Sequence, residues 1–329
     1  MDTTTREESL RPLGVIGCLA AGFDLVGRHL GLITLPVLLD LLLWLGPRLS
    51  MTRFFNLFTT LLQAQPPPST IAAGQVADAI QVLKQVGERF NLFSLLSSLP
   101  LLNLPSLLAY HPLEIVSPVG EPHLLVVKSI SAALAWVVFL LPTGLALGFL
   151  YLDGIANRVR TTQRDQKQNA EGKNRTWRFV RVILFAAGLY TAGLVLVPPL
   201  LLLSGLVETI APGMGSLLMM LGVGLLSYTG LQLLFVIPSV MVGERGLLRA
   251  TWESVGLMHT QMFSVIGLVM LMAIIYGGLV FIWLSPPADS WVLLVGIVGN
   301  SCIATGLTAA VFVFYQERVG QLVEIRRTA

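Results

Sequence analysis

Five long stretches without a charged side chain dominate this sequence of 329 residues. They cover residues 129–152, 182–207, 214–243, 260–288 and 290–316, and a sixth stretch, 29–47, contains a single charge at Asp40. A helix needs about 20 mostly apolar residues to cross the roughly 30 Å of hydrocarbon in a bilayer, and each stretch has about that length. A buried soluble core could explain one such stretch, but not six. The sequence therefore predicts an all-α fold, a polytopic integral membrane helical bundle with six transmembrane helices.

The composition agrees with this class, since only 12% of the residues are charged, against roughly 25% in soluble domains. The two cysteines, Cys18 and Cys302, fit no metal or redox spacing and are expected to pack as apolar residues. We expect one membrane domain over residues 1–329, with an external segment at 48–126 and a cytoplasmic basic loop at 153–181. The predicted spans lie at about 29–47, 129–152, 182–207, 214–242, 262–284 and 290–315.

Basic residues set the orientation of the spans, because Lys and Arg concentrate in cytoplasmic loops. Eight of them fall in residues 153–181, which places that loop inside. Alternation then puts both termini inside, with 16 of the 21 basic residues on the cytoplasmic side. We therefore predict a multi-pass protein of a bacterial inner membrane, with the lipid bilayer as its first partner. The same asymmetry explains the net charge of +3, so nothing favours nucleic-acid binding.

Two amphipathic helices are expected in the external segment, at residues 51–63 and about 71–99, separated by the prolines at 66–68. Apolar residues recur at helical spacing in both, for example Phe54 and Phe58 in the first and Ile80 and Leu83 in the second. Each apolar face needs a partner, which we expect to be the membrane surface or the outer ends of the spans. A lid or a docking platform is the functional alternative.

Residues 244–261 interrupt two spans with a helix that is apolar on one face, where Leu248, Trp252 and Val255 lie. Tryptophan favours the headgroup level of a membrane, so we predict an in-plane elbow helix on the cytoplasmic surface. A second elbow helix is predicted before the first span. An offset of 229 residues places Trp252 on Phe23 within the shared pattern G-x-L-x-A-x-[WF]-[ED]-x-V-G. Phe23 and Trp252 are therefore the predicted interfacial anchors of a parallel internal repeat.

Around the second elbow, the run VIPSVMVGERGLLRATWESVGLMHTQMFSVIG resembles a six-helix membrane domain. That domain precedes some bacterial glycerophosphodiester phosphodiesterases and has stand-alone relatives. In its pattern a Pro-containing span end is followed by Gly, a few residues and Ala-x-x-x-Ser, which match Pro238, Gly246, Ala250 and Ser254. The chain departs from the fused members in carrying no phosphodiesterase domain and in its longer external segment. The family offers no catalytic residues in its membrane part. The resemblance implies a helical module that handles lipids or supports other envelope proteins.

Four polar residues in or beside the spans form the candidate intramembrane site: Asp40, Lys128, Gln232 and Asn300. Asp40 is the one carboxylate inside a span, and intramembrane ionisable groups are costly enough to be functional candidates. Lys128, at the outer start of the second span, is its expected partner. The structural alternative is a buried pair or a neutral acid bonded to a neighbouring helix, in which case Asp40→Asn should cost little. Gln232 and Asn300 are expected to join helices by hydrogen bonds.

The sequence contains no Ser/His/Asp grouping, P-loop or dinucleotide fingerprint. One outer loop holds His111, Glu114, Glu121 and His123, which are residue types that bind zinc, but the proline after His111 moves that residue out of helical geometry. We therefore expect no metal, no cofactor and no enzymatic activity. The leading hypothesis is a non-enzymatic integral membrane protein that packs with, assembles or stabilises other membrane components or itself. The alternative is a small-molecule or lipid carrier with a cavity near Asp40.

Overall fold

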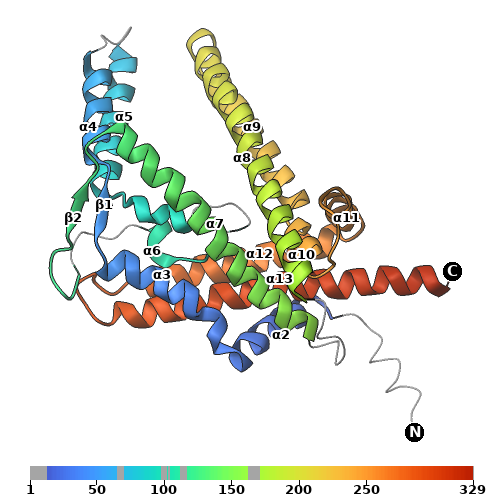
Figure 1. Ribbon diagram of the computed structural model, residues 1–329. Helices are drawn as coiled ribbons and strands as arrows, with labels where there is room; N and C mark the ends of the chain where they lie inside the picture. Colours follow the sequence, from blue (N-terminus) through green and yellow to red (C-terminus); the bar gives the residue numbers. More distant parts are fainter. Residues whose placement is uncertain are drawn as a thin grey trace.

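The computed structural model describes residues 13–64, 70–97, 102, 104–111, 117–161 and 171–328, and helices make up nearly all of its regular structure (Figure 1). The long helices are α7 (Ile130–Thr161), α8 (Glu171–Ile210), α9 (Met214–Gln232), α12 (Met262–Trp283) and α13 (Leu293–Thr328). The shorter ones are α2 (Val15–Arg28), α3 (Thr34–Leu45), α4 (Thr52–Ala64), α5 (Thr70–Arg89), α6 (Leu107–Tyr110), α10 (Val236–Met241) and α11 (Leu247–Thr260). Two short strands, β1 (Arg48–Ser50) and β2 (Leu124–Val126), pair in parallel and bring the two ends of the external segment together.

Among the described residues, five helices are long and apolar enough to cross a membrane, or six if one bent pair counts as a single span. The five correspond to α7, α8, α9 with α10, α12 and α13. Each overlaps one of the last five predicted spans. The prediction of a helical fold with five to six helices of membrane-spanning length and apolarity is confirmed, and it is compatible with a multi-pass membrane protein.

The first predicted span, 29–47, is wrong as a single straight helix. Leu30–Ile33 forms a 3-10 turn, and α3 has only 12 residues, which extend about 18 Å. The chain bends by 93° between α2 and the segment Leu30–Leu45. Pro36 lies in the first turn of α3, where a proline removes no hydrogen bond from inside the helix. Six spans result only if α2 and α3 together form one broken span.

The cytoplasmic basic loop is shorter than predicted. Helix α7 continues past residue 152 to Thr161, and α8 already begins at Glu171. Only residues 162–170 of the predicted loop lie outside the described residues, and most of its arginines therefore belong to helix ends. Hydropathy alone marks where a helix leaves the hydrocarbon, not where the helix stops.

The external segment begins with a hairpin of α4 and α5. Phe55 of α4 packs closely on Gly87 of α5, because a Cβ atom at Gly87 would lie 2.6 Å from the Phe55 Cβ. The apolar faces of α4 and α5 thus partly cover each other. Helix α5 ends at Arg89 rather than near residue 99, because the Asn91 side chain accepts the Leu49 N–H at 3.1 Å and turns the chain back toward β1. The prolines at 66–68 lie outside the described residues.

Helices α2 and α11, which lie where the two elbow helices were predicted, have the same length of 14 residues, and each begins directly after a glycine. Aligning those glycines, Gly14 and Gly246, gives an offset of 232 residues instead of the predicted 229. At the new offset the buried positions coincide, namely Cys18, Gly22 and Val26 in α2 with Ala250, Ser254 and Met258 in α11.

At the predicted offset, Leu19 (5% exposed) would correspond to Leu248 (81% exposed). The matching letters lie on different faces of their helices, so the predicted register is wrong. The two helices nevertheless share a length, a capping residue and a pattern of buried positions, and each leads into an apolar helix.

Helix α13 lies at the centre of the fold. In its most apolar stretch 67% of the residues are buried, against 17–28% in the other four long helices. Helix α2 packs directly on it, because a Cβ atom at Gly22 would lie 2.5 Å from the Gly306 carbonyl and 2.6 Å from the Ala310 nitrogen. Small residues on both helices allow this close approach.

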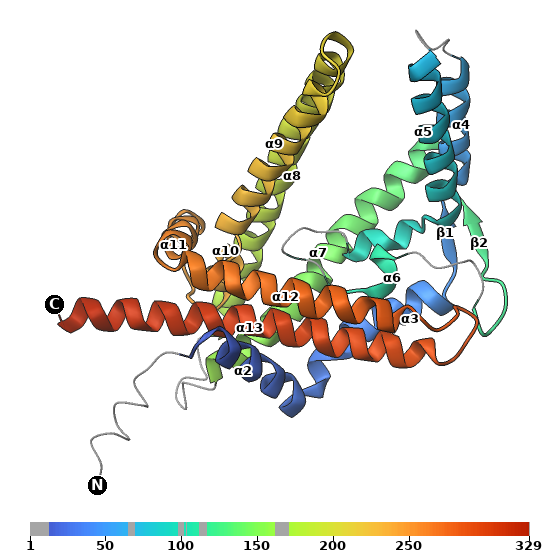
Figure 2. The ribbon, with the colours of Figure 1, turned by 180° about the vertical axis from the view of Figure 1, so that it is seen from behind.

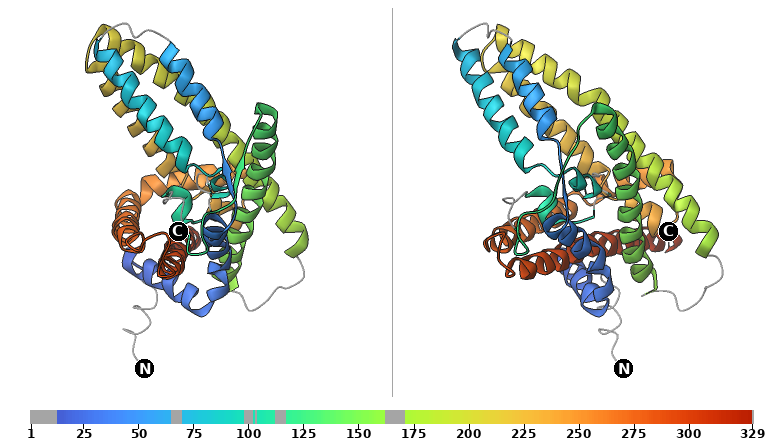
Figure 3. Two further views of the ribbon diagram at one scale, coloured as in Figure 1. Left: turned by 90° about the vertical axis from the view of Figure 1, so that its left-hand side faces the viewer. Right: turned by 60° about the vertical axis from the view of Figure 1, so that its left-hand side comes forward.

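Two hairpins, α4–α5 and α8–α9, project from the body that α2, α3, α7, α12 and α13 form (Figures 1 and 2). Both project toward the same side, and Figure 3 shows this from two further directions. Helices α12 and α13 run side by side, and the C-terminal end of α13 extends beyond the body (Figures 1 and 2).

Candidate intramembrane site around Asp40

Asp40 is fully buried in α3 and binds the start of α6. Its carboxylate accepts the backbone N–H of Leu107 at 2.9 Å and that of Leu108 at 3.1 Å. The hydroxyl of Ser106 donates to the same carboxylate. Ser106 also caps α6 by accepting the Ala109 N–H at 3.0 Å. Asp40 therefore holds the first turn of a short helix whose N–H groups have no partner inside that helix.

Helix α6 belongs to a part of the external segment that enters the helical bundle. In α7, a Cβ atom at Gly144 would lie 2.9 Å from the Leu96 backbone, and one at Gly148 would lie 2.1 Å from the Leu102 carbonyl oxygen. Leu102, Leu104 and Leu107 are all completely or almost completely buried. The G-x-x-x-G spacing of α7 thus seats a short 3-10 helix, Leu92–Ser97, and the irregular backbone at Leu102, rather than another transmembrane helix.

Backbone that is not helical must have its polar groups satisfied when it is buried at membrane depth. The side chains around this segment do so. The Ser97 hydroxyl donates to the Leu104 carbonyl at 2.5 Å, and the Tyr110 hydroxyl donates to the Ser97 carbonyl at 2.8 Å. Together with Asp40, these groups explain how an irregular segment can lie inside an apolar bundle.

Lys128 does not pair with Asp40. It is exposed at the outer start of α7, and its carbonyl accepts a hydrogen bond from Arg53 at 3.1 Å. No ion pair joins Asp40 to any of the described basic residues. The predicted pair is wrong because backbone N–H groups, which the sequence pattern does not reveal, occupy the carboxylate.

Asn300 lies in α13 and is 1% exposed. Neither amide atom makes a hydrogen bond of ordinary length to a described residue. The Tyr276 hydroxyl of α12 is a polar neighbour of this amide, and Tyr276 is also within electrostatic range of Asp40 and Tyr110. The structure therefore gathers Asp40 and Asn300, two of the predicted site residues, around one tyrosine.

A cavity of about 580 Å³ opens beside this group. Tyr110 and His111 line it from the external segment, Tyr276 and Met272 from α12, and Thr308 from α13. A few polar groups among mostly apolar walls are typical of sites for small molecules. The cavity could accept an amphipathic molecule.

Gln232 lies away from this group, at the break between α9 and α10. The contact to α11 is made by its backbone carbonyl, not by its half-buried side chain. The carbonyl accepts a hydrogen bond from the Ser254 hydroxyl at 2.6 Å. The same hydroxyl accepts the Phe235 N–H at 3.1 Å. The neighbouring Glu253 accepts a hydrogen bond from Tyr315 of α13 at 3.2 Å. Residue Ser254, singled out in the sequence by its pattern, thus fastens α11 to the broken end of a span.

The two predicted anchors differ in their surroundings. Phe23 is half-buried and packs on α13, where a Cβ atom at Gly306 would lie 2.4 Å from its ring. Trp252 is 76% exposed and shares its exposed face with Leu248. Phe23 is therefore a packing residue, whereas the headgroup role of Trp252 stays a prediction.

The sequence did not reveal a buried ionic cluster between the C-terminal end of α7 and the N-terminal end of α8. Asp153 is 1% exposed and lies 3.1 Å from Arg175, 3.4 Å from the 4% exposed Arg178 and 4.0 Å from Arg160. Arg160 also pairs with Glu244, in the linker before α11, at 3.1 Å. The available signal was an acid, Asp153, directly after a predicted span and beside many basic residues. Those basic residues also predict the topology, which conceals their role as partners of Asp153.

Arg181 extends this cluster to the linker between α10 and α11, since it donates to the carbonyls of Glu244 at 3.2 Å and Arg245 at 3.0 Å. Glu244 has a positive φ of 53°, which is uncommon outside glycine. The cluster thereby holds α7, α8 and the linker together at one end of the bundle.

Among the described residues, no group of three or more His, Cys, Asp or Glu side chains is placed to bind a metal ion. Glu114 of the outer loop lies outside that part of the chain. No protein-family model, curated protein or solved structure matches this chain. The arguments for function therefore rest on the residues and their geometry.

Proposed function

We propose that this protein is a non-enzymatic integral membrane protein that packs with and stabilises other membrane components or further copies of itself. The observation that carries the proposal is the α8–α9 hairpin. Its two helices are long and apolar enough to span a membrane, yet they contact the other helices mainly at one end, through α7, α10 and α11.

The hairpin is a tight unit in its own right. A Cβ atom at Gly215 would lie 2.2 Å from the Ser204 carbonyl, and one at Gly222 would lie 2.3 Å from the Leu200 side chain. Away from this seam, apolar residues such as Leu202 (70% exposed) and Met220 (65% exposed) are mostly uncovered by the described part of the chain. Transmembrane helices associate through packing and small residues, so a preformed hairpin is suited to bind further helices.

The geometry of Asp40 supports the same proposal against a proton- or cation-coupled carrier. Its carboxylate accepts three hydrogen bonds from Ser106, Leu107 and Leu108. A titrating group that works in transport must exchange protons or partners during a cycle. Asp40 instead serves as a fixed acceptor for buried backbone.

Photo-crosslinking in native membranes tests the proposal. A photoreactive residue at Leu202 or Met220 should give discrete adducts with a second membrane protein, and two differently tagged copies will tell whether the partner is the same protein. Phe281 of α12, which is 79% exposed, is the control for contacts with lipid and with random neighbours. Equal adduct yields at all three positions would contradict the proposal.

A second candidate function is supported by the cavity of about 580 Å³ beside Tyr276. In this alternative the protein binds or moves a small amphipathic molecule or lipid between α6, α12 and α13. The test is transfer of a fluorescent phospholipid across proteoliposome membranes. Ala304→Phe places a ring in the cavity wall and should abolish any transfer that the unmodified protein accelerates. Absence of acceleration by the unmodified protein would exclude phospholipid transfer.

A further inference from the structure

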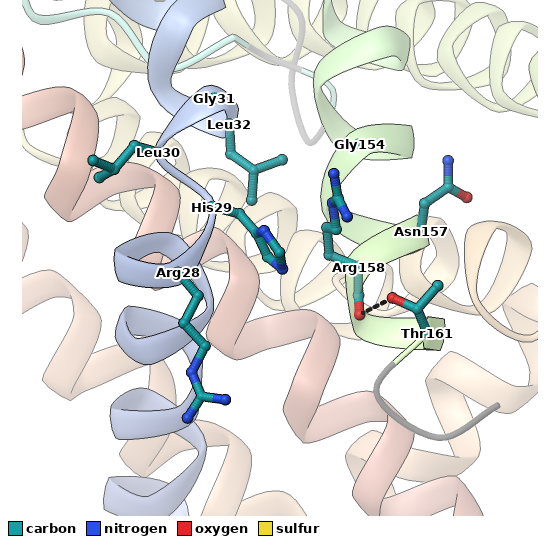
Figure 4. Close-up of a pocket in the computed structure, with 9 residues that line it drawn as sticks. All are labelled: Arg28, His29, Leu30, Gly31, Leu32, Gly154, Asn157, Arg158 and Thr161. Atoms are coloured by element: carbon teal, nitrogen blue, oxygen red, sulfur yellow. Dashed lines mark hydrogen bonds between the residues drawn. The ribbon is translucent and has the colours of Figure 1, made fainter. Parts of the chain in front are cut away.

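A second pocket lies at the bend between α2 and the segment Leu30–Leu45. It has a volume of about 610 Å³. One wall consists of residues 28–32 at the end of α2 and in the 3-10 turn, and the other consists of residues 154–161 at the end of α7 (Figure 4). The two walls come from parts of the chain that are more than a hundred residues apart in sequence, so the fold creates the pocket.

Three basic residues, Arg28, His29 and Arg158, line this pocket, and no carboxylate is among the nine residues that form it. Figure 4 shows the His29 ring and the Arg158 guanidinium turned toward the gap between the two walls, whereas the Arg28 side chain extends along α2. Guanidinium groups present N–H donors in a fixed fork that matches phosphate oxygens. The donors at this gap therefore favour an anion.

The neutral polar groups of the pocket are already bound to the protein. Asn157 accepts a hydrogen bond from Arg160 at 2.6 Å and donates to Asp153 at 3.4 Å. The Thr161 hydroxyl donates to the Arg158 carbonyl at 3.0 Å. Recognition of a ligand would therefore fall to the three basic side chains. Arg28 also forms an exposed ion pair with Asp24 on its own helix, with 2.9 Å between guanidinium nitrogen and carboxylate oxygen.

The apolar side of the pocket favours an amphipathic ligand. Leu30 is 62% exposed and Leu32 lies in the same wall. In the predicted topology, α2 lies along the inner surface and α7 leaves the membrane here, so the pocket is at the level of the lipid headgroups. Basic pockets between transmembrane helices on the cytoplasmic side bind anionic lipid headgroups in other proteins.

We infer that this pocket binds a phosphate group, presented by an anionic phospholipid of the inner leaflet. The phosphate lies between Arg158, His29 and Arg28, and the glycerol and first acyl carbons lie against Leu30 and Leu32. This site is separate from the cavity beside Tyr276 and does not depend on the proposed assembly function. It gives the protein a preference for anionic membranes at the bend of its first span.

Native mass spectrometry of the full-length protein in detergent, with phosphatidylglycerol or phosphatidylcholine added, tests the inference. Unmodified protein should retain phosphatidylglycerol preferentially. Arg28→Gln and Arg158→Gln should each weaken its binding about fivefold, and the double variant about 25-fold, because each basic residue near an anionic headgroup contributes a factor of that order. Phosphatidylcholine binding should not change. Arg249→Gln, an exposed arginine on the other elbow helix, is the matched control.

Gly31→Leu provides a variant that does not alter charge. No atom lies within 4 Å of a Cβ at Gly31, so the leucine should fill pocket space without disturbing the fold, and phosphatidylglycerol selectivity should fall. Inorganic phosphate at constant ionic strength is the last arm. Binding of phosphate that depends on Arg158, without binding of the lipid, would assign the site to a soluble anion. Unchanged lipid selectivity in both the double variant and Gly31→Leu would overturn the inference, as would equal loss in Arg249→Gln.

Discussion

At the scale of single residues, the Asp40 carboxylate is a fixed acceptor for the start of α6. Asp40 stood out because a carboxylate inside a span is costly. Its partners are mostly the backbone N–H groups of Leu107 and Leu108. Nearly every residue carries such a group, so a sequence pattern cannot show which ones Asp40 binds. Ser106 could have been recognised, since serine before a short apolar run is a common N-cap. The pairing of the two residues across 66 positions could not.

Substitution of Asp40 by Asn is now expected to be destabilising, which reverses the expectation from the sequence. An asparagine offers one oxygen, so its NH₂ group must face either the Leu107 or the Leu108 N–H. A buried donor without an acceptor costs about 1–3 kcal/mol, and we expect that loss in the free energy of unfolding. Denaturation by SDS in mixed micelles measures it.

A double-mutant cycle with Ser106→Ala separates the cap from a general effect of charge. Because both residues hold the same turn of α6, the double variant should lose less unfolding free energy than the two single variants lose together. An Asp40→Asn protein as stable as the unmodified one, but without its phenotype in cells, would contradict the structural role and favour the carrier alternative.

At the scale of elements, the apolar stretches predicted the long helices well and the shorter elements poorly. A helix that faces lipid must be apolar over its length, so hydropathy identifies α7, α8, α9, α12 and α13. The segment containing α6 is apolar because protein covers it, and its sequence resembles an ordinary buried loop. Similarly, the elbow register was misjudged because letter matches ignore which face of α2 or α11 is buried.

The two glycines of α7 that seat the external segment allow a direct test. Gly148→Ala would place a methyl group 2.1 Å from the Leu102 carbonyl, and overpacking of this kind costs about 1–3 kcal/mol. Gly188→Ala in α8 is the control, because no atom lies within 4 Å of its Cβ position. That change should be neutral or stabilising, since alanine favours helices by about 1 kcal/mol over glycine. Protease sensitivity of the external segment, read with unfolding midpoints, distinguishes release of the segment from unfolding of the bundle. Equal effects at both glycines would argue against a seat at Gly148.

At the scale of the whole molecule, the tryptophans support the predicted span boundaries independently of charge. Trp44 and Trp291 contact each other with ring centroids 5.6 Å apart, where α3 ends and α13 is about to begin. Trp283 is the last residue of α12, whereas Trp177 and Trp252 lie near the opposite ends of the spans. Tryptophan gathers at both membrane interfaces, so these positions mark two levels about one span apart.

The orientation itself is tested by cysteine labelling in intact cells. Glu121 lies in the exposed turn before β2, and His259 is exposed near the end of α11. The ionic cluster around Asp153 holds the arginines of α7 and α8 beside the linker that leads into α11. These elements therefore lie together, and the density of basic residues predicts that their side is cytoplasmic. A membrane-impermeant maleimide should therefore label Glu121→Cys in intact cells, and His259→Cys only after permeabilisation. Cys18 is buried and Cys302 partly buried, so Cys18→Ala and Cys302→Ala provide an unreactive background. Labelling of His259→Cys in intact cells, with Glu121→Cys protected, would invert the topology. It would also move the basic pocket at the bend of α2 to the outer leaflet.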